Sequence, residues 1–202
     1  THASFPYHFC QQCGYNECMS IIGFGIDVGG SGIKGARVDL ETGEFVGDRI
    51  KILTPKPATT DAVAETIVAI LNQAEWDGPV GITLPSVVKN QHAHTAANID
   101  PSWVNTDLTE LFSWHLPERR VHVLNDADAA GLAEVKFGHP DASHGSVIML
   151  TFGTGIGSAF FQDGVLFPNT ELGHLAFKNS EVEKYASSAV KDNEELSYTT
   201  WA

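Results

Sequence analysis

The sequence predicts a mixed α/β fold, and three features carry that prediction. A β-branched apolar segment from Ile21 to Asp27 runs into a glycine-rich turn, as a buried strand does when it enters a hairpin. Further along, apolar residues recur at helical spacing between Val63 and Leu71. A second strand–turn–strand pattern begins near Ser146. Hairpins that feed alternating strands and helices are typical of α/β proteins.

The first half of the chain begins with expected strands separated by glycine turns: 21–27, 35–40 and 45–53. Thr59 or Thr60 is expected to cap the following helix, which ends before Asp77-Gly-Pro. A short buried strand is expected over 80–84. Residues 85–118 are rich in turns, and their expected core anchors are Trp103, Leu108, Leu111 and Phe112.

The second half contains another short strand, over 121–124, and an alanine-rich helix from about Ala127 to Phe137. Two further strands are expected at 146–152 and 156–161, on either side of Gly153-Thr-Gly. Gln162-Asp-Gly supplies the turn that ends this pair.

Charge limits the classes of partner. The chain of 202 residues carries 12 basic and 25 acidic side chains, a formal net charge of −13. Generic binding to nucleic acid or to anionic membranes requires basic patches, so we expect neither. The chain contains no run of about eighteen apolar residues, so no membrane-spanning helix is predicted. The first residues also lack the pattern of a secretory signal, so we expect a cytoplasmic protein.

All cysteines of the chain lie near its start, at Cys10, Cys13 and Cys18. With His8 they form a set of soft ligands that zinc prefers. The alternative is an N-terminal extension over 1–18, disordered or non-native, because the following residues lead straight into the first strand. We favour the extension, since a short tail offers few outer groups to orient metal ligands.

Two glycine-rich turns are candidates for phosphate binding. The first, over 25–35, reads GIDVGGSGIKG, and the second, over 150–157, reads LTFGTGIG. Glycine permits positive φ and lets backbone N–H groups close around phosphate oxygens. Asp27 ends the first strand and can hold a hydrated Mg²⁺, with Lys34 supplying positive charge nearby. Two such turns in one chain predict a shared phosphate cleft.

Two polar segments are candidates for binding and activating an acceptor hydroxyl. In VLNDADAAG an apolar strand delivers Asn125 and Asp126 to its carboxyl end, where α/β proteins bind ligands. A carboxylate there can take the proton of an attacking hydroxyl. The structural alternative is that Asp126 only caps the next helix, and Asp128 is expected to point elsewhere. Asn169-Thr-Glu-Leu-Gly-His, followed by Glu183, supplies groups suited to sugar hydroxyls.

Together these motifs resemble the ROK (repressor, open reading frame, kinase) family, within it the branch of polyphosphate glucokinases and polyphosphate/ATP glucomannokinases. The resemblance runs from about Ile21 to the end of the chain. Its most specific segments are GIDVGGSGIKG, TAANIDPSW, LNDADAAG, LTFGTGIGSA and PNTELGH. Many family members bind structural zinc through cysteines soon after this last segment, but 175–182 contains none. Ser86 stands where the family usually has glycine.

The resemblance implies a role for each matching residue. Asp126 corresponds to the general base. The implied sugar-binding residues are Asn98, Asp100, Asn125, Glu171, His174 and Glu183. The implied phosphate-binding residues are Asp27, Gly29, Gly30, Ser31, Gly32, Lys34, Thr151, Gly153, Thr154 and Gly155, with Asp27 also holding Mg²⁺ through water.

The implied fold is the two-domain actin-like ATPase fold of sugar kinases, actin and Hsp70, which is ribonuclease H-like. Residues 19–124 form its N-terminal α/β domain, and 125–202 an incomplete C-terminal domain, since the family pattern continues beyond Ala202.

The implied activity is transfer of a phosphoryl group from inorganic polyphosphate, with ATP as an alternative donor, to the 6-hydroxyl of glucose. Mg²⁺ is the implied cofactor, mannose a second acceptor, and a homodimer the implied assembly. Two alternatives stay open: an ATP-preferring glucose and mannose kinase, and an inactive sugar-binding fragment. A third alternative, a repressor of the same family, is disfavoured because it requires a DNA-binding domain that residues 1–18 are too few to build.

Overall fold

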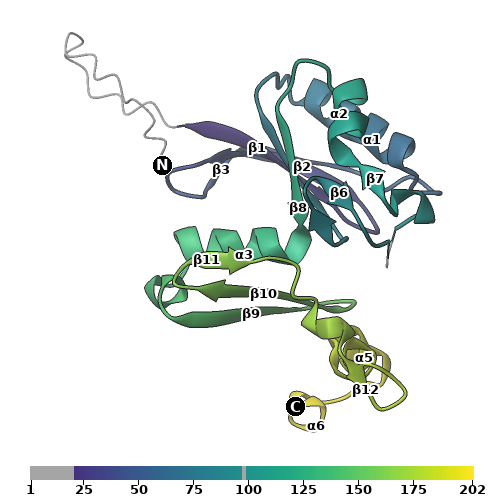
Figure 1. The fold of residues 1–202 in the computed structure, drawn as a ribbon, viewed down its shortest axis with the longest axis vertical. Coiled ribbons are helices and arrows are strands. Elements are labelled where there is room, and N and C mark those ends of the chain that lie inside the picture. Colours follow the sequence, from purple (N-terminus) through teal and green to yellow (C-terminus); the bar gives the residue numbers. More distant parts are fainter. Residues whose placement is uncertain (1–20, 97–98) are drawn as a thin grey trace.

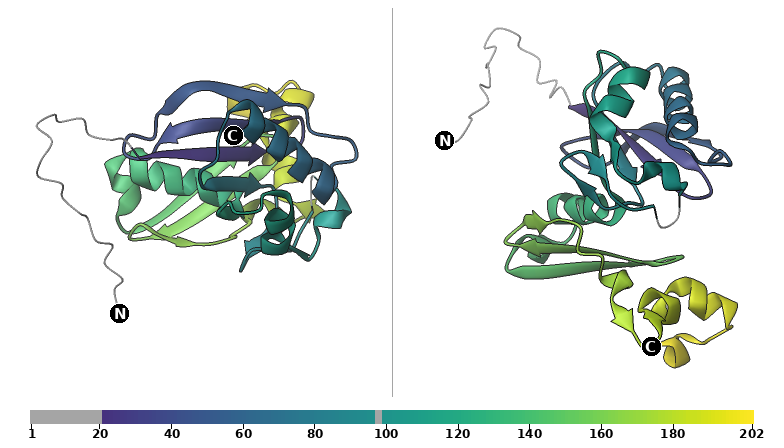
Figure 2. Two further views of the ribbon diagram at one scale, coloured as in Figure 1. Left: turned by 90° about the horizontal axis from the view of Figure 1, so that it is seen from above. Right: turned by 45° about the vertical axis from the view of Figure 1, so that its right-hand side comes forward.

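The computed structural model describes residues 21–96 and 99–202. In the described part, a five-stranded sheet with two covering helices lies on one side of helix α3, and a three-stranded sheet lies on the other (Figure 1). The right-hand view of Figure 2 shows the same succession of layers from another side, and the left-hand view looks along it, so that the sheets overlap. The predicted mixed α/β fold is confirmed.

The five-stranded sheet has the order β3-β2-β1-β4-β8. Antiparallel pairing joins the first three strands in the chain, and parallel pairing joins β1 to β4 and β4 to β8. The strands are β1 (Ile22–Val28), β2 (Ile33–Asp39), β3 (Phe45–Ile52), β4 (Val80–Leu84) and β8 (Val121–Asn125). β2 begins earlier than the predicted Gly35, because Ile33 and Lys34 pair with Val28 and Asp27. The parallel pairing brings the carboxyl ends of β1, β4 and β8 to one edge.

Helices α1 (Thr60–Gln73) and α2 (Leu108–His115) cover one face of this sheet (Figure 1). Thr59 caps α1, accepting a hydrogen bond from the Ala62 N–H at 3.4 Å. The apolar stripe predicted for this helix is buried and forms the core with the sheet: Val63, Ile67, Ile70 and Leu71. Burying such side chains contributes roughly 1.5–3 kcal/mol each.

The segment 85–118, expected to be turn-rich, contains more regular structure than its sequence indicates. Three short strands pair with one another, β5 (Val88–Lys89), β6 (His92–Ala93) and β7 (Thr106–Asp107). A 3₁₀ turn, η1 (Pro101–Trp103), precedes β7, and α2 follows it. Trp103, Leu108 and Phe112 are buried and Leu111 is partly buried, so the expected anchors do reach the core.

Helix α3 (Asp126–Phe137) packs on the sheet formed by β9 (Ser146–Phe152), β10 (Ile156–Gln162) and β11 (Val165–Phe167). Gly131 permits the close approach, because a Cβ at this position would overlap Ala159 and Phe161 of β10. The helix ends at Gly138, as predicted. The short 3₁₀ turn η2 (Pro140–Ser143) leads from it to β9.

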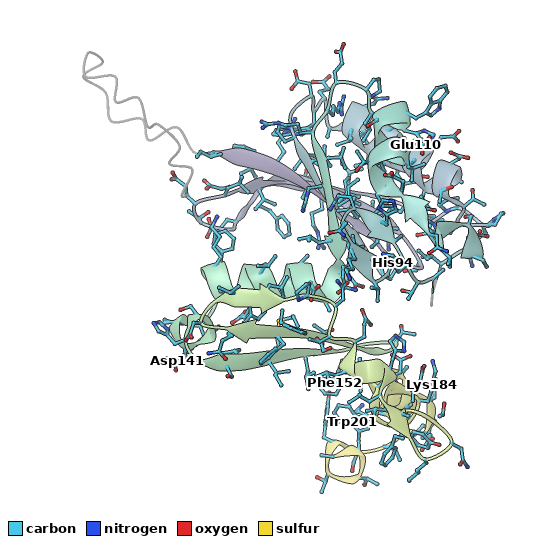
Figure 3. All side chains as sticks on the ribbon, viewed as in Figure 1. His94, Glu110, Asp141, Phe152, Lys184 and Trp201 are labelled. Carbon is cyan, nitrogen blue, oxygen red and sulfur yellow. The ribbon has the colours of Figure 1, made fainter. Side chains whose placement is uncertain are left out.

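The remaining chain forms short elements beside the end of β9. They are η3 (Leu172–His174), β12 (Ala176–Phe177), β13 (Ser180–Glu181), α4 (Glu183–Ala186), α5 (Ser188–Asn193) and α6 (Tyr198–Trp201). Trp201 packs edge-on against Phe152, with ring centroids 5.5 Å apart (Figure 3). Among the described residues, no helix combines the length and apolar composition that a membrane crossing requires.

Candidate active site

A cavity of about 550 Å³ lies where β1 and β8 end, and both glycine-rich turns reach it. Its volume is in the range of small-molecule sites. The walls come from five segments: the β1–β2 turn, residues 85–86 after β4, Thr95 after β6, the β8–α3 junction, and the chain from β9 to α4. The predicted site residues that line it are Asp27, Gly29, Gly30, Asn125, Asp126, Thr151, Gly153, Thr154, Gly155, Glu171, His174 and Glu183.

The first glycine turn joins β1 to β2. It is closed by a hydrogen bond from the Gly29 N–H to the Gly32 carbonyl at 3.2 Å. Thr54 donates its hydroxyl to the Gly29 carbonyl at 2.5 Å, which fixes the turn against the chain that follows β3. Only Gly29 and Gly30 of this turn line the cavity; Ser31 and Gly32 do not.

Asp27 ends at the cavity with both carboxylate oxygens engaged. Lys34 Nζ donates to Oδ2 at 3.0 Å, and the Thr83 hydroxyl donates to Oδ1 at 3.2 Å. Each oxygen keeps a further lone pair. Lys34 does not line the cavity. It holds the Asp27 carboxylate in place from behind the cavity wall.

The second glycine turn, between β9 and β10, rests on Glu183. The Ile156 N–H donates to Glu183 Oε2 at 3.2 Å, and a Cβ at Gly155 would overlap this carboxylate. Burial opposes the ionisation of Glu183, but hydrogen bonds from Lys184 and Ile156 outweigh it. The pKa of Glu183 therefore lies below its ordinary value. An ionised Glu183 fixes the turn and also lines the cavity.

The β8–α3 junction shows that Asn125, and not Asp126, is the N-cap of α3. Asn125 Oδ1 accepts from the Asp128 N–H at 3.0 Å, while its amide donates to the Ser86 carbonyl at 3.2 Å. Asp126 occupies the first helical position, where one oxygen accepts from the Ala127 N–H at 2.8 Å. The capping role considered for Asp126 thus falls to its neighbour, because only the residue before the helix has the extended backbone that a cap requires.

The Asp126 carboxylate lines the open cavity and stays exposed to solvent, but the surrounding walls limit its hydration. This desolvation raises the pKa of Asp126 above its ordinary value, and the negative charge of Asp27 raises it further. The hydrogen bond from Ala127 opposes both effects. A carboxylate with a raised pKa is a stronger proton acceptor, which is the property a general base needs.

Glu171 and His174 project from the loop between β11 and β12. Glu171 Oε1 accepts from the Asn125 amide at 3.2 Å, and His174 Nε2 lies 3.5 Å from Glu171 Oε2. Burial raises the pKa of Glu171, and the positive charge of a protonated His174 offsets part of that. The other ring nitrogen, His174 Nδ1, lies 3.2 Å from Glu181 Oε2. His174, Glu181 and Glu183 bring ligand atoms within 4.8 Å of one another, a grouping that the sequence did not reveal.

Several predictions fall outside this cavity or outside the described structure. Asp100 accepts from the Ser102 N–H at 2.9 Å and caps η1, and it does not line the cavity. Asn98 and the proposed zinc ligands His8, Cys10, Cys13 and Cys18 lie outside the described residues.

The structure adds Ser86 and Thr95 to the cavity lining, which sequence reasoning did not assign to the site. The Ser86 hydroxyl donates to the Thr95 carbonyl at 2.7 Å. The only sequence signal at Ser86 was that the family usually has glycine at this position.

Asp128 does not line the cavity, in line with the expectation that it points elsewhere; it is buried instead. Its Oδ2 accepts from the Asn169 N–H at 2.8 Å, which ties α3 to the loop that carries Asn169.

The chain matches the model of the ROK family over residues 23–188. It is 53% identical over 180 residues to a polyphosphate glucokinase of Mycobacterium tuberculosis, covering 89% of this chain and 68% of that protein.

Solved structures show the same likeness. An inorganic polyphosphate/ATP glucomannokinase of Arthrobacter sp. superposes with a TM-score of 0.81 at 43% identity, covering 89% of this chain and 74% of that one. A ROK family glucokinase of Streptomyces griseus, solved with glucose and AMPPNP, superposes with a TM-score of 0.72 at 28% identity. This match covers 84% of this chain and 58% of that one. The predicted actin-like fold of sugar kinases is therefore confirmed.

Proposed function

This chain belongs to the ROK family, and we propose that it is a glucokinase that transfers a phosphoryl group from inorganic polyphosphate to the 6-hydroxyl of glucose. One observation carries the proposal. A single cavity brings together a carboxylate suited to act as a base, Asp126, two glycine turns suited to phosphate, and polar side chains suited to sugar hydroxyls. The similarity to a polyphosphate glucokinase supports the choice of acceptor and donor.

In the proposed reaction, the 6-hydroxyl oxygen of glucose attacks the terminal phosphorus of the donor. The bond from that phosphorus to its bridging oxygen breaks, the hydroxyl proton passes to Asp126, and the donor leaves one phosphate shorter. Asn125, Glu171 and His174 orient the sugar from one side of the cavity. Most of the rate enhancement then comes from positioning and from stabilising charge on the transferred group.

Mg²⁺ fits the residues present. Carboxylate oxygens are its preferred protein ligands, and it usually keeps several waters. Asp27 would hold the ion through water, beside Gly29 and Gly30. The negative charge of Asp27 also acts on Asp126, whose pKa it raises. When bound, the ion neutralises charge on the phosphate oxygens.

Cations beside Asp27 support a polyanionic donor. Lys51 pairs in register with Lys34, which contacts Asp27. Arg49 lies two residues before Lys51 on β3 and lines a second cavity together with Asp27 and Lys34. In the described part of the chain Lys51 forms no ion pair. These cations lie on β2 and β3 outside the cavity lining, where they suit the distal part of a phosphate chain, and an acidic protein has few cations to place there.

An assay coupled to glucose 6-phosphate formation, with Mg²⁺ and either polyphosphate or ATP, tests the proposal. We expect turnover with polyphosphate, and a rate roughly 10²- to 10⁴-fold lower for Asp126→Asn. The matched control is Asp141→Asn, since Asp141 lies on η2 outside the cavity (Figure 3). No turnover from folded chain with either donor would overturn the proposal and favour a sugar-binding fragment without activity. Turnover with ATP alone would favour the ATP-preferring alternative.

Further parts of the proposal concern acceptor range and assembly. We propose mannose as a second acceptor, testable in the same assay, and a cytoplasmic homodimer, testable by sedimentation equilibrium. We also propose that 19–124 and 125–202 form two domains. The five-stranded sheet falls almost entirely in the first range, and the sheet of β9, β10 and β11 falls in the second.

A further inference from the structure

The loop that carries Glu171 and His174 has an unusual backbone. Asn169 has φ of 57° and Glu171 has φ of 46°, both in the left-handed region. Asparagine tolerates this region better than glutamate does, but Glu75, Glu118 and Glu195 also adopt it, so the contacts around the loop have to show what holds it in place. Glu171 lines the cavity from this loop. What anchors the loop therefore decides where a sugar-binding carboxylate lies.

One anchor of this loop lies in the sheet of β9, β10 and β11, from which the loop itself emerges. Ser158 of β10 accepts from the Leu172 N–H at 2.9 Å through its hydroxyl, and from the Thr170 hydroxyl at 3.2 Å through its carbonyl. These bonds fix the loop against the sheet from which it emerges. They do not connect it to the opposite wall of the cavity.

Asp128 supplies the second anchor, from α3. Its side chain is 2% exposed, and its Oδ2 accepts from the Asn169 N–H at 2.8 Å. Within the described part of the chain, its other oxygen, Oδ1, is buried without a hydrogen-bond partner. A buried carboxylate with an unmet acceptor costs stability. Stability alone is therefore a poor explanation for an aspartate at this position.

Asn169 extends the anchor to β5, outside the cavity lining. Its side-chain Oδ1 accepts from the Val88 N–H at 2.9 Å, and its Nδ2 donates to the Val88 carbonyl at 2.9 Å. Val88 belongs to β5 and lies two residues after Ser86, which lines the cavity on the side of the five-stranded sheet. Asp128, Asn169 and Val88 thus link α3, the Glu171 loop and β5, whose first residue lies two positions after the wall residue Ser86.

We propose that Asp128 and Asn169 form a clamp that sets the affinity for the acceptor sugar by holding the Glu171 loop against β5. Both are positioning residues, since neither lines the cavity. The inference rests on the proposed function for the identity of the sugar. The clamp itself is defined by contacts that do not depend on that function.

Kinetic constants for glucose separate this role from a merely structural one. Asp128→Ala removes the acceptor for the Asn169 N–H, and we expect the KM for glucose to rise roughly ten- to hundredfold. The kcat and the KM for polyphosphate should change less than about threefold, because the interaction lost is made equally in the ground and transition states. Asp128→Asn keeps an acceptor oxygen and should restore the KM to within about twofold of the parent. A simply destabilised protein would lose folded material without a shift in KM.

A double-mutant cycle tests whether the two residues act together. Asp128→Ala and Asn169→Ala should be clearly less than additive in their effect on KM, because each breaks the same link. Asn169→Asp keeps the backbone donor and the Oδ1 acceptor but replaces the amide donated to the Val88 carbonyl with a carboxylate oxygen that repels this carbonyl, so it tests the clamp even if the alanine variants fold poorly. An additive cycle, or an Asn169→Asp variant with the parent KM, would overturn the proposal.

Amide hydrogen exchange gives a readout that needs no turnover. In Asp128→Ala, exchange of the amides over 169–174 should accelerate, while Asp128→Asn should keep the protection of the parent. Unchanged exchange in Asp128→Ala would overturn the clamp whatever the chain catalyses. If the parent has no glucose kinase activity but the exchange behaves as expected, the clamp stands and the proposed function fails.

Discussion

Asn125 donates a hydrogen bond from its side-chain amide to Glu171 Oε1 across 3.2 Å, joining the end of β8 to a loop far along the chain. The oxygen of the same side chain caps α3. One residue therefore serves helix stability through its oxygen and cavity geometry through its nitrogen. The two roles can be separated by substitution.

Asn125→Ser keeps a capping oxygen but loses the bonds to Glu171 and Ser86, so the KM for glucose should rise roughly tenfold. Asn125→Ala loses the cap as well and should lower the free energy of unfolding by about a further 1 kcal/mol. Steady-state kinetics and urea denaturation of both variants measure the two effects. Equal unfolding free energies for the serine and alanine variants would contradict the capping role.

Activity should depend on the ionisation of Asp126. Its raised pKa means that the acid limb of kcat/KM for glucose lies at higher pH than an ordinary aspartate would give. Activity rises with pH through that value, because only the ionised carboxylate accepts the proton. A pH–rate profile with polyphosphate as donor measures the limb. A limb at or below the ordinary pKa of aspartate would exclude Asp126 as a desolvated base.

The same shift predicts a gain in stability on removing the charge. A carboxyl whose folded-state pKa is raised contributes stability that is fully present below its unfolded pKa and is lost as pH rises through its folded pKa. Asp126→Asn should therefore melt at a higher temperature than the parent at neutral pH, and the difference should shrink as the pH falls below the unfolded pKa. Thermal melts at several pH values check this. A variant less stable than the parent at neutral pH would be inconsistent with a desolvated carboxylate.

Gly155 has no space for a side chain. Its Cβ would overlap the Glu183 carboxylate that accepts from the Ile156 N–H. Gly155→Ala should lower the free energy of unfolding by about 1–3 kcal/mol through overpacking. Gly153→Ala is the control for stability, because a Cβ there meets nothing within 4 Å. Denaturant titrations compare the pair, and equal losses would show that Glu183 does not support the turn.

Helix α3 should tolerate a larger side chain at its exposed positions but not at Gly131, which faces β10. Gly131→Leu places a side chain against Ala159 and Phe161, so the cost of overpacking, about 1–3 kcal/mol or more, should exceed the gain of roughly 1 kcal/mol in helix propensity. The neighbouring exposed position provides the control, Ala130→Leu, which should change stability by less than about 0.5 kcal/mol. Unfolding midpoints of the two variants decide the point. Comparable midpoints would mean that α3 does not pack tightly on β10.

Local patterns predicted the elements whose conformation depends on their own residues. Apolar alternation and glycine turns predicted β1–β4 and β8–β10, and the stripe from Val63 to Leu71 predicted α1. The strand before Asn125 also placed that residue and Asp126 at a sheet edge, where the structure has them. The short strands β5–β7 and helix α2 were not predicted, because their residues carry too little periodicity to specify a conformation alone. Pairing between His92 and Asp107, distant in the sequence, stabilises them.

The sequence alone determined which residue types were available for phosphate, sugar and proton transfer, and that two glycine turns follow two strands. Only the tertiary structure decided which of them meet. It placed Glu183 beneath Gly155, moved Asp100 and Lys34 out of the cavity lining, and joined Asp128 to Val88 through Asn169. The reason is physical: periodicity and turn chemistry record local backbone preference, whereas a hydrogen bond between Asn169 and Val88 depends on how α3 packs between two sheets.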